Sequence, residues 1–170
     1  MTTWTEVLHP PHTGLTRRWG DVSATHYAVP VGRVLFALIF VTAGFKHFLP
    51  GTIAWAGSQG VPLAALLVPL SGLLAVIGGL SIAVGWQTRA GAAMVILFLV
   101  PVTLAMHGYW RAGDPAAAAA QAVHFWKNVA MLGGALLLLH HGGGPVSLDQ
   151  WREGLAARGA KGTRPPGSAA

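Results

Sequence analysis

Polar side chains that could carry chemistry gather in the last long apolar stretch of the chain. His124, Lys127 and Asn128 lie at i, i+3 and i+4, a spacing that places them on one face of an α-helix. The stretch around them, residues 124–139, reads HFWKNVAMLGGALLLL. An ionisable group inside a bilayer is costly and normally faces a bundle interior or a wet cavity. This face therefore predicts neighbouring helices and suggests a ligand.

Three further ionisable residues are expected at the same depth. Lys46 and His47 end the first apolar stretch, and His107 ends the third. If the stretches cross a membrane in alternating directions, these ends meet the start of the fourth stretch on one side. No aspartate or glutamate lies within the apolar stretches. The resulting layer offers hydrogen-bond donors and proton-exchanging histidines without a fixed counter-anion.

Such a layer suits an electron-rich or anionic ligand. A lysine at partial depth must snorkel, lose its proton or find a strong acceptor. Lysine would stabilise the negative charge that develops on a quinone oxygen during reduction, and histidine can deliver the protons. We expect His107 and His124 to handle protons. The residues expected to bind the quinone are Lys46, His47, Lys127 and Asn128. A lipid phosphate or a small oxoanion would satisfy the same groups.

Ordinary structural roles compete for several of these residues. Lys46 can equally be a snorkelling anchor, and His47 and His107 can cap helix ends. Lys127 is the hardest to explain in this way, because it lies inside an apolar segment. Three histidines from three helices could ligate zinc or copper, but no histidine pair has i, i+4 spacing with a carboxylate nearby. We therefore predict no metal site.

Four apolar stretches must position these groups, and each is near the roughly 20 residues that a helix needs to cross a bilayer. The expected spans are residues 30–49, 61–85, 88–109 and 121–140. The 170-residue chain is 53% hydrophobic and only 9% charged, whereas a soluble domain is roughly 25% charged. The sequence therefore predicts an all-α fold, an integral membrane four-helix bundle.

Basic residues at the ends of the spans predict the orientation. Arg17, Arg18 and Arg33 flank the first span, Arg89 lies between the second and third, and further basic residues follow the fourth. The positive-inside rule then places both termini in the cytoplasm, in a multi-pass protein of the cell inner (plasma) membrane.

Three regions are expected along the chain. They are an N-terminal cytoplasmic tail at 1–30, a membrane domain at 31–141 and a C-terminal tail at 142–170. Ser147 and Gln150 have the spacing of a capping box. This pattern predicts a short helix near 147–157, lying on the inner membrane surface.

Composition excludes several classes of function. Cysteine is absent, which removes thiolate metal sites, iron–sulfur clusters and dithiol relays within the chain. No haem, flavin or cluster motif appears, so electrons would have to come from a partner or a small reductant. The net charge of +6 is spread over tails and helix ends. The expected contact is therefore the lipid bilayer and not nucleic acid.

Short motifs in a fixed order resemble the DoxX family of small four-helix membrane proteins. They cover about residues 31–150. The matching motifs are Gly32-Arg33, Ala43-Gly44-Phe45-Lys46, Gly78-Gly79, Gly85 with Thr88-Arg89, His107 with Tyr109-Trp110, His124-Phe125-Trp126-Lys127-Asn128, Gly133-Gly134 and Ser147-Leu148-Asp149.

The resemblance implies contact with quinone. The founding relatives are subunits of a membrane thiosulfate:quinone oxidoreductase, and other members are linked to oxidative-stress complexes in bacterial membranes. Relatives often carry a glutamate about three residues before the paired glycines, where this chain has Ala75. If that acid relays protons in relatives, this protein either uses its histidines or does not perform that chemistry.

Two functions remain open. The leading one is a membrane subunit that binds quinone and assists electron transfer from a redox partner or small reductant to the quinone pool, which leaves open whether the chain is itself an enzyme. The alternative is a non-enzymatic anchor that recruits a soluble oxidoreductase or oxidative-stress enzyme. A transporter or channel is less favoured, because four short helices leave little room for a pore unless the chain forms a homo-oligomer.

Overall fold

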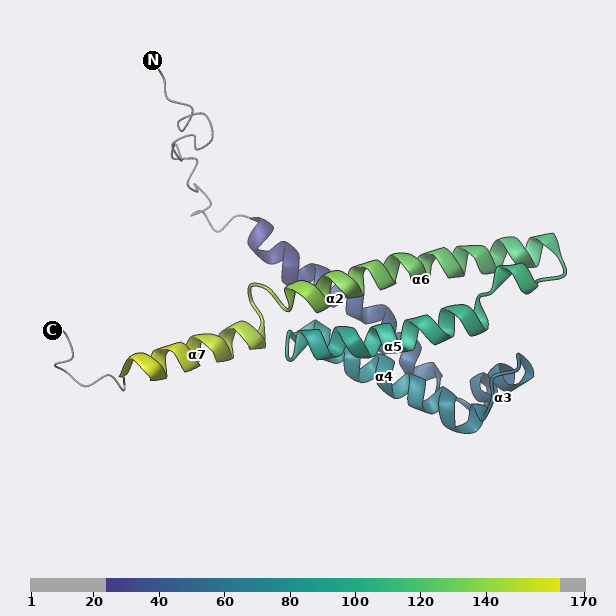
Figure 1. The fold of residues 1–170 in the computed structure, drawn as a ribbon, viewed down its shortest axis with the longest axis horizontal. Coiled ribbons are helices and arrows are strands. Elements are labelled where there is room, and N and C mark those ends of the chain that lie inside the picture. The colour runs from purple at the N-terminus through teal and green to yellow at the C-terminus, as the bar shows by residue number, and fades with distance from the viewer. Residues whose placement is uncertain (1–23, 163–170) are drawn as a thin grey trace, which may run out of the picture.

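The computed structural model describes residues 24–162, which fold entirely into helices, turns and short connections (Figure 1). Most of the expected N-terminal tail lies outside these residues. The elements are α2 (Ala24–Lys46), α3 (Pro50–Ser58), α4 (Ala64–Val84), α5 (Thr88–Met106), the 3₁₀ turn η1 (Tyr109–Arg111), α6 (Pro115–His141) and α7 (Leu148–Gly162).

Four segments are long and apolar enough to cross a membrane, which confirms the predicted all-α, four-span architecture. They are His26–Lys46, Ala64–Val84, Thr88–Arg111 and Pro115–His141. Figure 1 places the start of α2 and the start of α7 at the same end of the bundle, here called the Arg33 end. The opposite end, where α2 stops and α6 begins, is here called the Lys46 end. The cytoplasmic placement of the termini stays a prediction.

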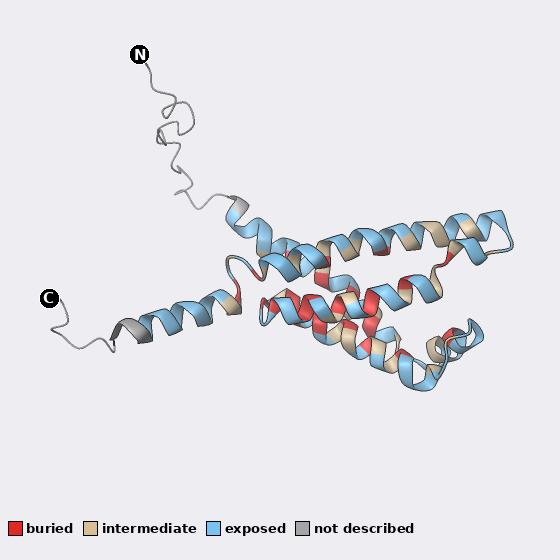
Figure 2. Ribbon diagram, in the orientation of Figure 1, coloured by how far each residue is buried: buried red, intermediate tan, exposed pale blue. Residues whose placement is uncertain are grey.

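The spans pack in the order of the chain, with α2 against α4, α4 against α5 and α5 against α6. Figure 2 shows the buried residues concentrated on α4 and α5, whereas α6 is largely exposed. The buried apolar core consists of Ala37, Phe40, Ala75, Ile82, Ala92, Val95, Phe98, Leu99 and Ala135. Most large apolar side chains face outward instead, as lipid contact requires.

Glycines set the distance between α2 and α4. A Cβ atom added at Gly72 would lie 2.6 Å from Cβ of His47 and 2.8 Å from the carbonyl oxygen of Gly44. The backbones therefore approach too closely for any side chain at this point, which is how helices associate where lipid removes the hydrophobic drive.

Two boundaries differ from the expected spans. The first span was expected at residues 30–49, but α2 ends at Lys46 and a separate helix, α3, begins at Pro50, whose missing N–H and fixed φ suit a helix start. The fourth span begins at Pro115, because the side chain of Asp114 accepts a hydrogen bond of 2.8 Å from the backbone N–H of Ala117. The alanines at 116–120 extend the helix.

Arg33 is buried inside the bundle instead of flanking it, with 3% of its surface exposed. Its guanidinium donates to the carbonyl of Gly143 and, at 2.8 Å, to that of Val146. These carbonyls belong to the loop between α6 and α7. Arg33 therefore ties this loop to α2, and its charge is met by peptide dipoles.

The predicted C-terminal helix is present as α7. The backbone N–H of Gln150 donates to Oγ of Ser147 at 3.1 Å, as a capping box requires. The Gln150 side chain accepts from the N–H of Val146, one residue earlier than the pattern predicts. Figure 1 shows α7 pointing away from the bundle, and its placement on the membrane surface stays a prediction.

Candidate functional site

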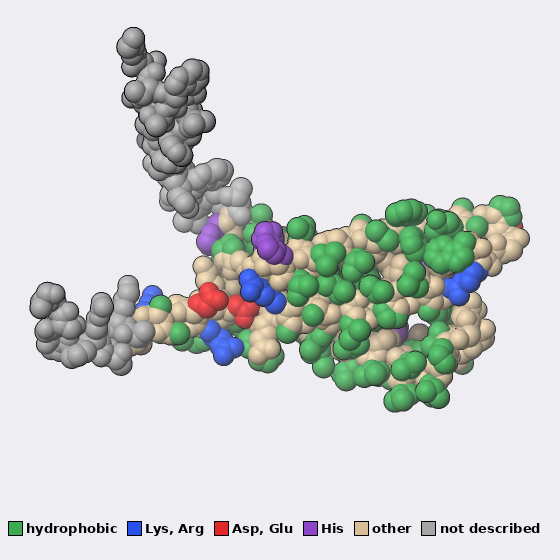
Figure 3. Space-filling model, viewed as in Figure 1, with side chains coloured by type: hydrophobic (Ala, Val, Ile, Leu, Met, Phe, Trp, Pro, Cys, Tyr) green, Lys and Arg blue, Asp and Glu red, His purple; other side chains and the backbone are tan. Residues whose placement is uncertain are grey.

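A cavity of about 620 Å³ lies at the Lys46 end, where α2, α3, α4, α5 and α6 meet. Its walls are largely apolar and include Phe40, Trp55, Phe98 and Met131. Figure 3 shows the molecule hollowed between α3 and the neighbouring spans. A mostly apolar pocket of this size with a few polar groups is typical of a small-molecule site.

Five of the six predicted site residues line this cavity. They are Lys46, His47, His107, Lys127 and Asn128. They come from the end of α2, the end of α5 and the first half of α6, so the predicted convergence of three spans is present. Among all the residues that line the cavity, none is aspartate or glutamate.

His124 does not line the cavity, but it contacts two residues that do. Its ring stacks on that of His107, with centroids 5.2 Å apart and planes 25° apart. Its Nδ1 lies 3.2 Å from Nζ of Lys127. Since a lysine ammonium can only donate, Nδ1 of His124 is the acceptor in this contact.

Asn128 is held in place by a buried polar pair. Its Nδ2 donates to Oγ1 of Thr103 at 3.1 Å, and that hydroxyl donates to the carbonyl of Leu99 at 2.6 Å. The hydroxyl proton is thus committed to Leu99, so the threonine oxygen must accept from the amide nitrogen. Among the described residues, the amide oxygen of Asn128 has no partner of its own.

Hydrogen bonds also orient the two histidines of the wall. Nδ1 of His47 lies 3.0 Å from the carbonyl oxygen of Ala43, and Nδ1 of His107 lies 2.9 Å from Oε1 of Gln121. These oxygens only accept, so Nδ1 carries the proton in both rings. Nε2 is then the free nitrogen, which accepts a proton in the neutral ring and donates one in the charged ring.

Two contributors to the site were not predicted from the sequence. The helix α3 supplies Thr52 and Trp55 to the wall, and its only signal is Pro50 at a helix start. Gln121 fixes the ring of His107. Its signal is its position one turn before His124, on the same face of α6.

Ala75 lies outside the cavity. It is fully buried, and a Cβ atom built on Gly44 would lie 3.2 Å from the Cβ of Ala75. The position that relatives often fill with glutamate therefore lies in the α2–α4 contact of this chain.

Between residues 24 and 162, no group of three histidine, cysteine, aspartate or glutamate side chains could hold a metal ion. The histidines stack and bond to amides and lysine instead, as the contacts of His107 and His124 show.

Comparison with known proteins decides the family. A family model described as DoxX matches residues 28–108. The inner membrane protein YphA of Escherichia coli (strain K12) is 32% identical over 139 residues, which cover 79% of this chain and 98% of YphA. The chain belongs to the DoxX family. Its relative is named an inner membrane protein, and this DoxX protein, with four candidate spans, is a multi-pass protein of the inner membrane. No solved structure matches it.

Proposed function

We propose that the cavity at the Lys46 end binds a quinone, and that this DoxX protein assists electron transfer to it from a partner or small reductant. One observation carries the proposal: four ionisable side chains and one amide, from three spans, line one largely apolar cavity that no acid lines. Two lysines without a counter-anion favour a ligand whose oxygen atoms accept hydrogen bonds or gain negative charge.

The residues that line the cavity could contact both the ring and the oxygen atoms of a quinone. The rings of Phe98 and Trp55 supply flat apolar walls, and Lys46 and Lys127 supply charged donors. When bound, a quinone accepts two electrons and two protons. The amide oxygen of Asn128 can accept from a hydroxyl, because its nitrogen is committed to Thr103.

A proton route follows from the contacts on α6. Lys127 and His124 are both exposed; Lys127 also lines the cavity, and Nδ1 of His124 accepts a hydrogen bond from its ammonium. A proton that Lys127 gives to the ligand can be replaced when the His124 ring is doubly protonated, because its Nδ1 then donates to the neutral amine. Nε2 of His107 is a second site where a proton can be exchanged, because Nδ1 of this ring is hydrogen-bonded to Gln121.

The decisive experiment is to purify the protein in mild detergent, extract the bound quinone and compare wild type with Lys127→Ala. Stoichiometric quinone in the wild type and a loss of at least about tenfold in the variant are expected, since a hydrogen bond from a charged group contributes about 1.5–3 kcal/mol. Arg158→Ala on α7 is the matched control, because it removes an exposed cation far from the cavity. If neither preparation holds or binds quinone, the proposal fails.

An anchor function is the second candidate, and exposed apolar side chains on α7 favour it. Leu148, Trp151 and Leu155 remain exposed, Trp151 by 64%, while Asp149, near the start of α7, is hydrogen-bonded to Gly85, Gln87 and Thr88 of the bundle. A soluble oxidoreductase could dock on this face. Trp151→Ala combined with Leu155→Ala would then release the docked enzyme while the quinone content of the membrane domain stays unchanged.

A further inference from the structure

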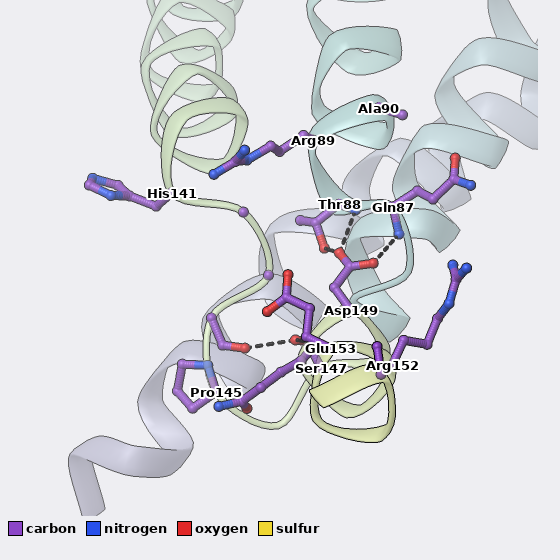
Figure 4. A pocket seen from close by; sticks show the side chains of 15 residues that line it. Gln87, Thr88, Arg89, Ala90, His141, Pro145, Ser147, Asp149, Arg152 and Glu153 are labelled. Atoms are coloured by element: carbon purple, nitrogen blue, oxygen red, sulfur yellow. Dashed lines mark hydrogen bonds between the residues drawn. The ribbon is translucent and has the colours of Figure 1, made fainter. Parts of the chain in front are cut away.

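A second cavity, of about 940 Å³, lies at the Arg33 end, where α5 begins, α6 ends and α7 leaves the bundle (Figure 4). The residues that carry its charges are Arg89, His141, Asp149, Arg152 and Glu153. It is separate from the quinone cavity, and no residue lines both. Neither the family nor the proposed function assigns it a role.

Asp149 is already committed to the protein. Its carboxylate accepts from the backbone N–H groups of Gln87 and Thr88, at 2.6 and 2.9 Å, and from the Thr88 hydroxyl at 2.9 Å. These bonds satisfy the first amides of α5, so the positive end of that helix is occupied. Any ligand of this groove must therefore use the other charged side chains.

The charges of Asp149 and Arg152 act on each other, which leaves Arg89 and Glu153 as the other two charges of the groove. Arg89 uses one nitrogen, Nη2, to donate to the carbonyl of His140 at 3.2 Å, and a guanidinium has further donors. Glu153 makes no hydrogen bond or ion pair with any described residue. Figure 4 shows its carboxylate pointing from α7 toward the part of the groove where Arg89 and His141 lie. Besides Asp149 and Arg152, the groove thus presents one cation and one anion, Arg89 on α5 and Glu153 on α7, that form no ion pair with each other.

The position of the groove near the ends of two membrane spans favours a lipid as its ligand. It adjoins Thr88 and His141, which end two membrane spans, so it lies at the depth of phospholipid headgroups. Leu97 on α5 and Leu137 on α6 are exposed further along the same spans. Acyl chains extending from a headgroup in the groove would meet such apolar surface.

The charge balance favours a zwitterion over an anion. Two arginines and two carboxylates line the groove, so the lining carries no net charge when His141 is neutral. We propose that the groove binds the headgroup of an aminophospholipid, of the phosphatidylethanolamine class, with the phosphate on Arg89 and the ammonium on Glu153. Arginine suits a phosphate oxygen pair, and a carboxylate accepts from a primary ammonium, which a choline headgroup cannot offer.

Native mass spectrometry of the full chain tests the site. The protein is first delipidated and then mixed with equal amounts of phosphatidylethanolamine, phosphatidylcholine and phosphatidylglycerol that have identical acyl chains. Wild type is expected to retain phosphatidylethanolamine at least about threefold over the other two, the scale of an exposed ion contact. Glu153→Gln should lose that preference, and Arg89→Gln should lower retention of all three. Arg89→Lys keeps the charge and should retain most binding, which separates lost phosphate contact from a loosened α5–α6 contact.

Arg158→Gln is the matched control, since Arg158 is exposed on α7 and does not line the groove. Glycerophosphoethanolamine, the headgroup without acyl chains, is added as a competitor and should displace less than about a tenth of the lipid. Full displacement would mean that a soluble phosphate ester suffices. That result, equal retention of the three lipids, or a Glu153→Gln profile identical to wild type would each overturn the proposal.

Discussion

Nζ of Lys127 lies 3.2 Å from Nδ1 of His124, one turn earlier on α6. The contact joins a residue of the cavity wall to a histidine outside the wall, so in the proposed quinone site it would link proton exchange at the ligand to the exterior. Replacing His124 by Gln keeps an acceptor for the ammonium but removes proton exchange. We expect His124→Gln to retain quinone within about twofold, while reduction of the bound quinone by dithionite slows on the order of 10²-fold, the scale of general acid–base catalysis.

Stopped-flow absorbance from about pH 5.5 to about pH 8 measures this effect, because the range brackets the ordinary histidine pKa of about 6.5. The wild-type rate should vary with pH across it, and the variant should show a weaker dependence. His26→Gln is the control, since His26 is exposed at the Arg33 end. An unchanged rate and pH profile in His124→Gln would remove His124 from the route.

The Asn128–Thr103 pair predicts a stability effect that depends on which partner is removed. Asn128 is only 5% exposed, so Thr103→Val, which keeps the side-chain volume, leaves a buried amide N–H without its acceptor. This should cost about 1–3 kcal/mol. Combining it with Asn128→Leu removes both polar groups and should recover most of the loss. Reversible unfolding in mixed micelles measures both. A Thr103→Val protein as stable as wild type would contradict the assigned amide orientation.

Local spacing and span topology were enough to predict most of the site. The face formed by His124, Lys127 and Asn128 follows from helical periodicity alone. The meeting of that face with His107 follows from four alternating spans, because alternation fixes which ends lie together. The cavity confirms this convergence, while the roles assigned to the residues stay predictions.

Long-range contacts were not predictable. Pro50 is compatible with both the end and the start of a helix, so α3 and its part of the wall were missed. Arg33 had the appearance of a basic flank, because nothing local indicates that its partners, the carbonyls of Gly143 and Val146, follow more than a hundred residues later. The position of Ala75 between α2 and α4 likewise depends on packing.

Asp149 predicts a stability change at acid pH. Partial burial acts to raise its pKa, but hydrogen bonds from Thr88 and Gln87 and the charge of Arg152 outweigh this, and the pKa is lowered. A carboxyl with a lowered folded-state pKa contributes stability that is present above its unfolded pKa of about 3.9. That stability is lost as the pH falls through the lower, folded value.

Asp149→Asn should therefore be less stable than wild type at pH 7, by about 1–2 kcal/mol as for a lost helix cap. The difference should shrink below about pH 4, where the wild-type carboxyl takes up a proton. Thermal unfolding across pH measures it. Glu153→Gln is the matched control on the same helix, because Glu153 makes no bond to a described residue. A constant difference between Asp149→Asn and wild type at all pH values would mean that the charge of Asp149 is not involved.

Gly72 and Gly133 predict opposite outcomes for the same substitution. A methyl group at Gly72 would lie 2.6 Å from Cβ of His47 and 2.8 Å from the Gly44 carbonyl oxygen, whereas nothing lies within 4 Å of one at Gly133. Gly72→Ala must separate α2 from α4 and should cost about 1–3 kcal/mol. Gly133→Ala should leave stability unchanged or raise it by up to about 1 kcal/mol, because alanine is the better helix former.

The pair also tests the cavity, because His47 forms part of its wall. Displacing His47 by Gly72→Ala should lower quinone retention, while Gly133→Ala should leave it unchanged. Unfolding in micelles and quinone extraction from the same preparations provide both measurements. If Gly72→Ala retains its full quinone content at reduced stability, the wall tolerates movement of α2 and His47 is not a ligand. If both variants match wild type in stability, the close approach of α2 and α4 is not required.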